Sequence, residues 1–133
     1  VMALYADHDG LAYDVVLEKG ALVSIDRDQL TQVLVNLVKN GEEAMAGRKG
    51  AIHVRVNRGD QVILEVEDEG PGIPAELKAR LFEPYVTTKP QGTGLGLAIA
   101  LRICQEHGGR LEVSDGAAGG ALFRVSLPAL SPR

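Results

Sequence analysis

The sequence predicts one α+β domain over residues 1–133, a two-layer α/β sandwich in which a mixed, largely antiparallel sheet is covered on one face by helices. Two segments repeat apolar residues with the 3.6-residue period of a half-buried helix, and several others alternate apolar and polar residues as strands do. Glycine and proline separate these segments. The chain has 133 residues, 45% hydrophobic and 24% charged, which fits one domain with its own core and excludes wholesale disorder.

The chain is predicted to begin with short strands. Residues 2–7 and 13–18 are expected to be extended, on either side of a turn at Asp9-Gly10. A further short extended piece is expected at residues 21–25.

A long helix is predicted next. Asp26, followed three residues later by Gln29, resembles a capping box, and Gly47 and Gly50 mark the end of the helix. The apolar positions that predict the buried face of this helix are Leu30, Val33, Leu34, Leu37, Val38, Ala44 and Met45.

A β-hairpin is predicted after this helix, with its turn at residues 58–60. Its first strand directs His53, Arg55 and Asn57 to the outer face. The inward-facing apolar positions of the two strands are Ile52, Val54, Val56, Val62, Leu64 and Val66.

The second half of the chain continues the pattern. Pro74 opens a short helix that ends before Pro84, and residues 84–94 lack periodicity, so a mobile loop is expected there. A second long helix is predicted over 95–106, closed by two glycines. Two last strands are predicted, over 110–114 and 121–127, and the second directs Phe123, Val125 and Leu127 to one face.

Charge, cysteine content and hydropathy exclude several classes of partner. The net charge is −4 with a pI near 5.3, which disfavours nucleic acid. The single cysteine, Cys104, lies in an apolar run and is expected to be a buried thiol in a reducing cytosol. No apolar run approaches the roughly 18 residues that span a bilayer, so a cytoplasmic domain without direct membrane contact is expected.

Four polar residues form a stripe beside the apolar face of the first long helix. With Asn36 at zero degrees, Asn40, Glu43 and Gln32 all fall within about 40° on a wheel of roughly 100° per residue. Asparagine is a mediocre helix former, so two of them one turn apart indicate neutral oxygen ligands, with Asn40 binding Mg²⁺. Taken alone, the stripe is more typical of a solvated helix face.

Asp68, Gly70, Gly72 and Ile73 follow directly on a predicted strand. A carboxylate at a strand end can accept a hydrogen bond from an amino group such as that of adenine, and the glycines allow a flat base to approach the backbone. Gly70, Gly72 and Ala75 also fit a dinucleotide fingerprint. That alternative is rejected, because prolines interrupt the segment and no second parallel strand with a ribose-binding acid follows.

A second glycine-rich segment, Gly92-Thr93-Gly94-Leu95-Gly96, opens the second long helix. Backbone N–H groups at a helix N-terminus favour anions. Lys89 in the preceding loop is a candidate phosphate contact, although a lone lysine in a loop is more often solvated. The segment is not a Walker A loop, since no Gly-Lys-Ser/Thr follows, and Leu97 stands where a dinucleotide motif needs its third glycine.

These segments, in this order, resemble the ATPase superfamily that unites histidine kinases, gyrase, the large heat-shock chaperone and MutL. The stretch 36–44 resembles the N box, 68–73 the G1 box, 81–89 the F box with the start of the ATP lid, and 92–99 the G2 box. The amino-acid sequence of the F box and lid is most similar to that of nitrogen-regulation sensor kinases of the NtrB/NtrY group. The resemblance implies a Bergerat-type fold and binding of ATP with Mg²⁺.

The resemblance also implies residue roles. Asn40 would be the metal ligand with Asn36 near the phosphates, and Asp68 would hydrogen-bond the adenine amino group. The candidate ATP-binding residues are Asn36, Asn40, Glu43, Asp68, Gly70, Gly72, Ile73, Phe82, Thr88, Lys89, Gly92, Thr93, Gly94, Leu95, Gly96 and Leu97. Gly41 stands where the family usually has alanine, and a glycine inside a helix costs about 1 kcal/mol, which would loosen the hold on Asn40.

One position separates the branches of the superfamily. The hydrolases carry a water-activating glutamate one turn before the metal-binding asparagine, whereas Asn36 stands there in this chain and cannot act as a general base. This favours transfer of the γ-phosphoryl group to a histidine. His8, His53 and His107 all suit surface or capping roles, so the acceptor is expected on a separate dimerisation domain absent from this chain.

Further partners follow from the resemblance. A response regulator would act downstream, and the isolated domain is expected to be a monomer. Two alternatives stay open: an ATP-driven clamp or hydrolase, and a nucleotide-binding regulatory module that no longer transfers phosphate.

Overall fold

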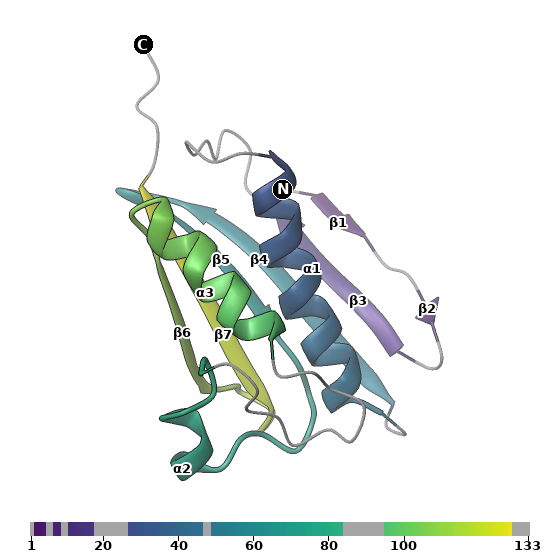
Figure 1. Ribbon diagram of the computed structural model, residues 1–133. Coiled ribbons are helices and arrows are strands. Elements are labelled where there is room, and N and C mark those ends of the chain that lie inside the picture. The colour runs from purple at the N-terminus through teal and green to yellow at the C-terminus, as the bar shows by residue number, and fades with distance from the viewer. Residues whose placement is uncertain are drawn as a thin grey trace.

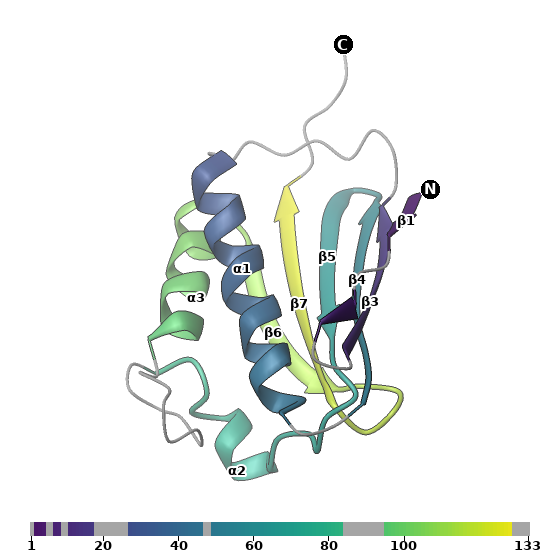
Figure 2. The ribbon, with the colours of Figure 1, turned by 90° about the vertical axis from the view of Figure 1, so that its right-hand side faces the viewer.

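The computed structural model describes residues 2–4, 7–8, 11–17, 27–46, 49–83 and 95–128. The described part of the chain forms two layers, with a curved sheet on one side and two long helices packed side by side on one of its faces (Figures 1 and 2). The predicted fold class, a mixed and largely antiparallel sheet covered by helices, is confirmed.

The described strands form one seven-stranded sheet in the order β1-β3-β4-β5-β7-β6, with β2 paired beside β3. Only β3 and β4 run parallel among the described pairs; the other pairs are antiparallel. The strands are β1 (Met2–Leu4), β2 (Asp7–His8), β3 (Leu11–Leu17), β4 (Gly50–Arg58), β5 (Gln61–Glu67), β6 (Arg110–Asp115) and β7 (Ala121–Pro128).

The hairpin and the two C-terminal strands agree with the sequence. Of the strand predicted over 2–7, the described residues form β1 and the start of β2, whereas the strand predicted over 13–18 begins earlier, at Leu11. Both β1 and β2 pair with β3, so the early segment folds back on one strand. The extended piece expected at 21–25 and the turn at Asp9-Gly10 lie outside the described residues.

Three helices are described: α1 (Arg27–Ala44), α2 (Ala75–Lys78) and α3 (Gly96–Glu106). α1 connects the parallel strands β3 and β4, a connection that must cross over the sheet and is usually helical. α3 ends as predicted at its glycines: Gly109 N–H donates to the Cys104 carbonyl at 2.8 Å and Gly108 N–H to that of Gln105 at 3.1 Å. This pair of bonds is a Schellman motif, with Gly108 at φ +73°.

The core lies between the helices and the sheet. Val33, Leu37 and Met45, three of the apolar positions that the sequence assigned to the buried face of α1, are at most 1% exposed. α3 contributes Ala100, Ile103 and Cys104 from its facing side. The sheet residues of the core are Ile52, Val54, Leu64, Val66, Leu111, Ala121, Phe123, Val125 and Leu127.

Cys104 is a structural thiol. It is fully buried, as the sequence suggested, and burial raises its pKa to about 11. A thiol with so high a pKa is almost entirely protonated at neutral pH and is a poor nucleophile.

Among the described helices, none has the length and hydropathy of a membrane-spanning segment.

Gly41 does not interrupt α1. The helix continues through it, and Met45 N–H donates to the Gly41 carbonyl at 3.0 Å. A Cβ atom at this position would lie 3.6 Å from Ile52 Cδ1 and 3.7 Å from Asp68 Cβ, which is ordinary van der Waals contact. The cost of Gly41 is therefore one of backbone entropy, and no gap or strain in the fold requires a glycine there.

Gly41→Ala is expected to raise the free energy of unfolding by about 1 kcal/mol, since it gains helix propensity and fits the available space. Urea denaturation followed by circular dichroism measures this change. Gly120→Ala is the matched control: a Cβ there would lie 2.6 Å from Asp68 Oδ1, so this variant should lose stability. A neutral or destabilising Gly41→Ala would show that the helix needs its glycine.

Candidate nucleotide-binding site

The acidic residue singled out from the sequence is fixed at the end of β5. The antiparallel register places Asp68 beside Ala121, the first residue of β7: Asp68 N–H donates to the Ala121 carbonyl at 3.0 Å. Asp68 Oδ1 accepts hydrogen bonds from the N–H groups of Gly70 at 2.9 Å and Ala121 at 3.2 Å. The side chain is only 2% exposed, so these bonds hold a nearly buried carboxylate in one orientation.

Glycines surround this carboxylate because the backbone passes very close to it. A Cβ atom on Gly120 would overlap the Asp68 carbonyl oxygen and approach Oδ1 to 2.6 Å. Gly72 has φ +80°, and a Cβ there would lie 2.6 Å from the Gly119 carbonyl oxygen. The segment after Asp68 and the turn before β7 are therefore packed backbone against backbone.

The polar stripe of α1 reaches the start of α3. Gln32 Nε2 donates to Asn36 Oδ1 at 2.8 Å, and Asn36 Nδ2 donates to the Gly96 carbonyl at 3.0 Å. Both ends of the Asn36 amide are thus engaged, one within α1 and one across to the first residue of α3. Asn36 is a connection between the two helices, a role that the sequence alone did not indicate.

Asn40 and Glu43 continue the stripe towards the end of α1, where the side chain of Asn40 is half-buried and that of Glu43 is exposed. Gly41, the neighbour of Asn40, faces Asp68, because a Cβ atom on Gly41 would lie 3.7 Å from Asp68 Cβ. The second half of α1 therefore lies between the N-terminus of α3 and the carboxylate at the end of β5. The described residues bring these three features of the predicted site into one region.

The apolar candidates line the same region from the core. Ile73, Phe82 and Leu97 are partly buried and pack against the core cluster. The ring of Phe82 meets that of Phe123 edge to face, with centroids 6.3 Å apart and an interplanar angle of 80°. Packing alone explains the positions of these three side chains, and contact with a ligand stays a prediction.

The N-terminus of α3 has the chemistry of an anion site. Its cap residue, Leu95, supplies no side-chain acceptor, and its first turn contains no acidic residue. The N–H groups of a first helical turn and the helix dipole favour a negative charge at such an end. Thr88, Lys89, Gly92, Thr93 and Gly94, which the sequence assigns to the same site, lie outside the described residues.

The donor set suits a magnesium ion held jointly with a nucleotide. The described residues contain no group of three His, Cys, Asp or Glu side chains that could hold a metal. Mg²⁺ bound with phosphates needs only one or two protein oxygens, because phosphate oxygens and water supply the others. The amide of Asn40, at the edge of the region described above, is such an oxygen donor.

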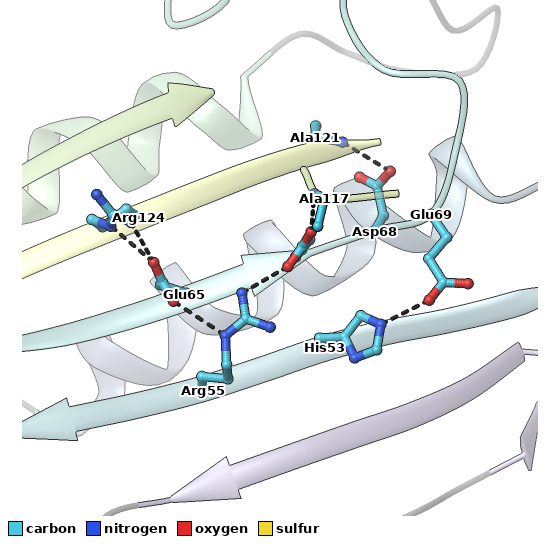
Figure 3. A network of polar contacts seen from close by, with 9 residues as sticks. His53, Arg55, Glu65, Asp68, Glu69, Ala117, Ala121 and Arg124 are labelled. Atoms are coloured by element: carbon cyan, nitrogen blue, oxygen red, sulfur yellow. Dashed lines mark hydrogen bonds and ion pairs between the residues drawn. The ribbon is translucent and has the colours of Figure 1, made fainter. Parts of the chain in front are cut away.

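Charged residues on the open face of the sheet form a network that sequence reasoning missed (Figure 3). Arg55 on β4 donates to Glu65 at 3.1 Å and to Glu67 at 2.7 Å, and Arg124 on β7 donates to Glu65 at 2.7 Å. Glu65 and Glu67 are 9% and 7% exposed. The sequence assigned Arg55 to this outer face correctly, but gave no sign that its partners are buried.

The arginines keep both glutamates ionised. Burial by itself raises the pKa of Glu65, but hydrogen bonds and charge from Arg124 and Arg55 outweigh it and hold the pKa below its usual range. Burial likewise raises the pKa of Glu67. Hydrogen bonds from Arg55 and the Ala117 N–H, together with the charge of Arg55, again lower it below the ordinary value. These are buried carboxylates with partners, which is the condition for stable burial of charge.

Two of the three histidines have side chains that the structure describes, and both make polar contacts. His53 Nε2 lies 2.8 Å from Glu69 Oε2, and His107 Nδ1 lies 2.8 Å from the Ile103 carbonyl at the end of α3. The side chain of His8 lies outside the described part.

Comparison with known proteins gives the family. The family model of histidine kinase-, DNA gyrase B- and HSP90-like ATPases matches residues 25–131. The chain is 38% identical to the nitrogen regulation protein NtrY of Azorhizobium caulinodans, in a match that covers all of this chain and 18% of NtrY. It is 44% identical to the sensory histidine kinase/phosphatase NtrB of Rhodobacter capsulatus, in a match that covers 77% of this chain and 32% of NtrB. The chain therefore spans less than a third of either relative.

Solved structures agree with the sequence relatives. The catalytic domain of the histidine kinase ThkA, in a nucleotide-free form, superposes with a TM-score of 0.79 at 37% identity. The match covers 90% of this chain and 79% of that domain. The resemblance stated from the sequence motifs, including that to the nitrogen-regulation kinases, is confirmed.

Proposed function

The chain belongs to the family of histidine kinase-, DNA gyrase B- and HSP90-like ATPases, and we propose that within it the chain is the ATP-binding catalytic domain of a sensor histidine kinase. In this role residues 1–133 bind ATP with Mg²⁺. They transfer the γ-phosphoryl group to a histidine on a separate dimerisation domain, in two-component signal transduction. The likeness to NtrY, NtrB and ThkA supports this choice among the branches of the family.

The side chain of Asn36, by its chemistry and its contacts, is the observation that favours a kinase over a hydrolase. In the ATP hydrolases of this superfamily, a glutamate stands at that position and activates water. Here the side chain is an amide, which cannot take up a proton, and both of its ends are engaged, with Gln32 and with Gly96. A site without a water-activating base suits transfer to another acceptor.

The nucleotide would lie across the region between α1, α3 and the end of β5. The fixed carboxylate of Asp68 would accept a hydrogen bond from the adenine amino group, beside Gly70, Gly72 and Ile73. The phosphates would lie at the start of α3, where Gly92, Gly94 and Gly96 would offer backbone N–H donors. Mg²⁺ would be held by Asn40. The remaining predicted contacts, partly in the lid, are Asn36, Glu43, Phe82, Thr88, Lys89, Thr93, Leu95 and Leu97.

ATP would supply the phosphoryl group, and Mg²⁺ would neutralise part of the charge of the phosphates. The protein's contribution is positioning and electrostatic stabilisation, which is where most of the catalysis of phosphoryl transfer arises. Asp68 fixes the base, and the N-terminal amides of α3 hold the phosphates. The contact between Asn36 and Gly96 sets α3 against α1, so that the groups for the two ends of the nucleotide keep their spacing.

Partners follow from the same proposal. The relatives are longer proteins with further sequence beyond the matched part, in agreement with a dimerisation domain that carries the acceptor histidine. A response regulator would receive the phosphoryl group afterwards. We expect the isolated domain to be a cytoplasmic monomer that binds neither nucleic acid nor membrane directly.

The test is phosphotransfer between separate domains. With γ-labelled ATP and Mg²⁺, this domain should label the histidine-bearing hairpin domain of its parent protein. The label should survive alkali and be lost in acid, and the domain alone should release little phosphate. Rapid ATP turnover without the acceptor domain would instead support the clamp or hydrolase alternative. ATP binding without labelling would support the regulatory module.

A further inference from the structure

The turn between β6 and β7 connects the open face of the sheet to the candidate site. It comprises residues 116–120 and closes on itself, with Gly116 N–H donating to the Gly120 carbonyl at 2.8 Å and Gly119 N–H to the Gly116 carbonyl at 3.1 Å. Two hydrogen bonds within five residues make the turn a compact unit. The turn is therefore a short, internally bonded link between its two ends.

At its first end the turn rests on Glu67. Glu67 Oε2 accepts a hydrogen bond from Ala117 N–H at 2.7 Å, and a Cβ atom on Gly116 would lie only 2.7 Å from the same oxygen. Arg55 Nη2 holds the other oxygen, Oε1, at 2.7 Å. The carboxylate is thus fixed at both oxygens, by a strand of the sheet on one side and by the turn on the other. Figure 3 shows Arg55 and Ala117 at the two ends of this contact.

At its second end the turn meets Asp68. Gly120 packs directly against the backbone and the carboxylate of Asp68, and Ala121 N–H donates to Asp68 Oδ1 at 3.2 Å. The Gly119 carbonyl lies against Gly72, which belongs to the same candidate site. The turn therefore packs against Asp68 on one side and is held by Glu67 on the other.

We propose that Glu67 is a positioning residue for adenine recognition, acting through the 116–120 turn to hold the Asp68 carboxylate in place. Glu67 itself lies on the open face of the sheet, and its described contacts are with Arg55 and the turn. This inference rests on the proposed function, because it takes Asp68 as the group that recognises the base. Arg55 supports Glu67 from the neighbouring strand.

The sequence offers a matched control on the same strand. Glu65 lies two residues before Glu67, on the same face of β5, is equally buried, and is also paired with arginines. Its described contacts are with Arg55 and Arg124, on β4 and β7, and none of them is with the turn. Glu65→Ala therefore removes a buried, paired carboxylate without touching the connection to Asp68.

The experiment measures calorimetric dissociation constants for analogues of ATP and of inosine triphosphate, which carries a carbonyl in place of the adenine amino group. Wild type, Glu67→Ala and Glu65→Ala are compared at a temperature where all three are folded. Glu67→Ala should weaken binding of the ATP analogue about tenfold, as loss of a supporting group behind a ligand-binding residue commonly does. It should also reduce the preference for ATP over inosine triphosphate, whereas Glu65→Ala should change neither quantity.

A merely structural role for Glu67 would weaken both nucleotides equally and leave the preference unchanged, which would overturn the proposal. Equal behaviour of Glu67→Ala and Glu65→Ala would overturn it as well. If an alanine variant does not fold, the same comparison between Glu67→Leu and Glu65→Leu decides, because leucine keeps much of the side-chain volume but has no oxygen to accept the hydrogen bond from Ala117 N–H. Failure of wild type to bind the ATP analogue would refute the proposed function itself, and is thereby distinguished from failure of this inference.

Discussion

Asp68→Asn is expected to weaken ATP-analogue binding by about 1.5 to 3 kcal/mol, roughly 10- to 150-fold in Kd, the range for loss of a hydrogen bond to a charged group. The asparagine Oδ1 can still accept the bonds from Gly70 and Ala121. The fold should therefore survive. Its Nδ2, however, is a donor where the adenine amino group needs an acceptor.

The same substitution should change base preference. The carbonyl of inosine triphosphate can accept a hydrogen bond from the asparagine Nδ2, so the preference for ATP should shrink or reverse. Glu69→Gln is the matched control: Glu69 is the next residue, but its carboxylate bonds to His53 and to Ala51 N–H, away from Asp68. Calorimetry with both nucleotides measures the change. An unaltered base preference in Asp68→Asn would remove Asp68 from base recognition.

Asn40→Ala is expected to abolish most of the Mg²⁺ dependence of ATP-analogue binding. In wild type, Mg²⁺ should strengthen binding, and the variant should lose at least about tenfold of that gain, since a contact with a charged group contributes roughly 1.5 to 3 kcal/mol. Affinity without the metal should change little. Alanine is a better helix former than asparagine, so weaker binding in this variant could not be attributed to loss of α1.

Gln32→Ala serves as the control for Asn40→Ala, because it removes another side-chain amide from the same stripe, at an exposed position two turns earlier. It should leave the Mg²⁺ dependence intact. Titrations of both variants with and without Mg²⁺ give the result. If the Mg²⁺ dependence were the same in wild type and Asn40→Ala, the metal ligand would have to be another residue.

Local chemistry explains what the sequence could predict. The helices are recognisable because their apolar residues repeat with the helical period, and Val33 and Leu37 are indeed fully buried. The hairpin strands alternate, and the ends of α3 follow from its glycines. Asp68 at a strand end also follows from the sequence, because carboxylate and glycines lie within a few residues of each other.

Features that depend on distant segments could not be predicted. The bond from Asn36 to Gly96 joins residues 60 positions apart, and its existence depends on how α1 and α3 pack. Glu65 and Glu67 occupy positions that alternation assigns to the solvent side, yet arginines from two neighbouring strands and the 116–120 turn cover them. The pairing of β7 beside β5 creates that surface, and strand order is not contained in any local pattern.

The most direct test of the account is the crystal structure of this domain with an ATP analogue and Mg²⁺. The account requires one bound nucleotide whose adenine amino group donates to Asp68 and whose metal ion is coordinated by Asn40. A nucleotide bound elsewhere, or one that contacts only one of these two residues while the other faces a different part of the molecule, would contradict it.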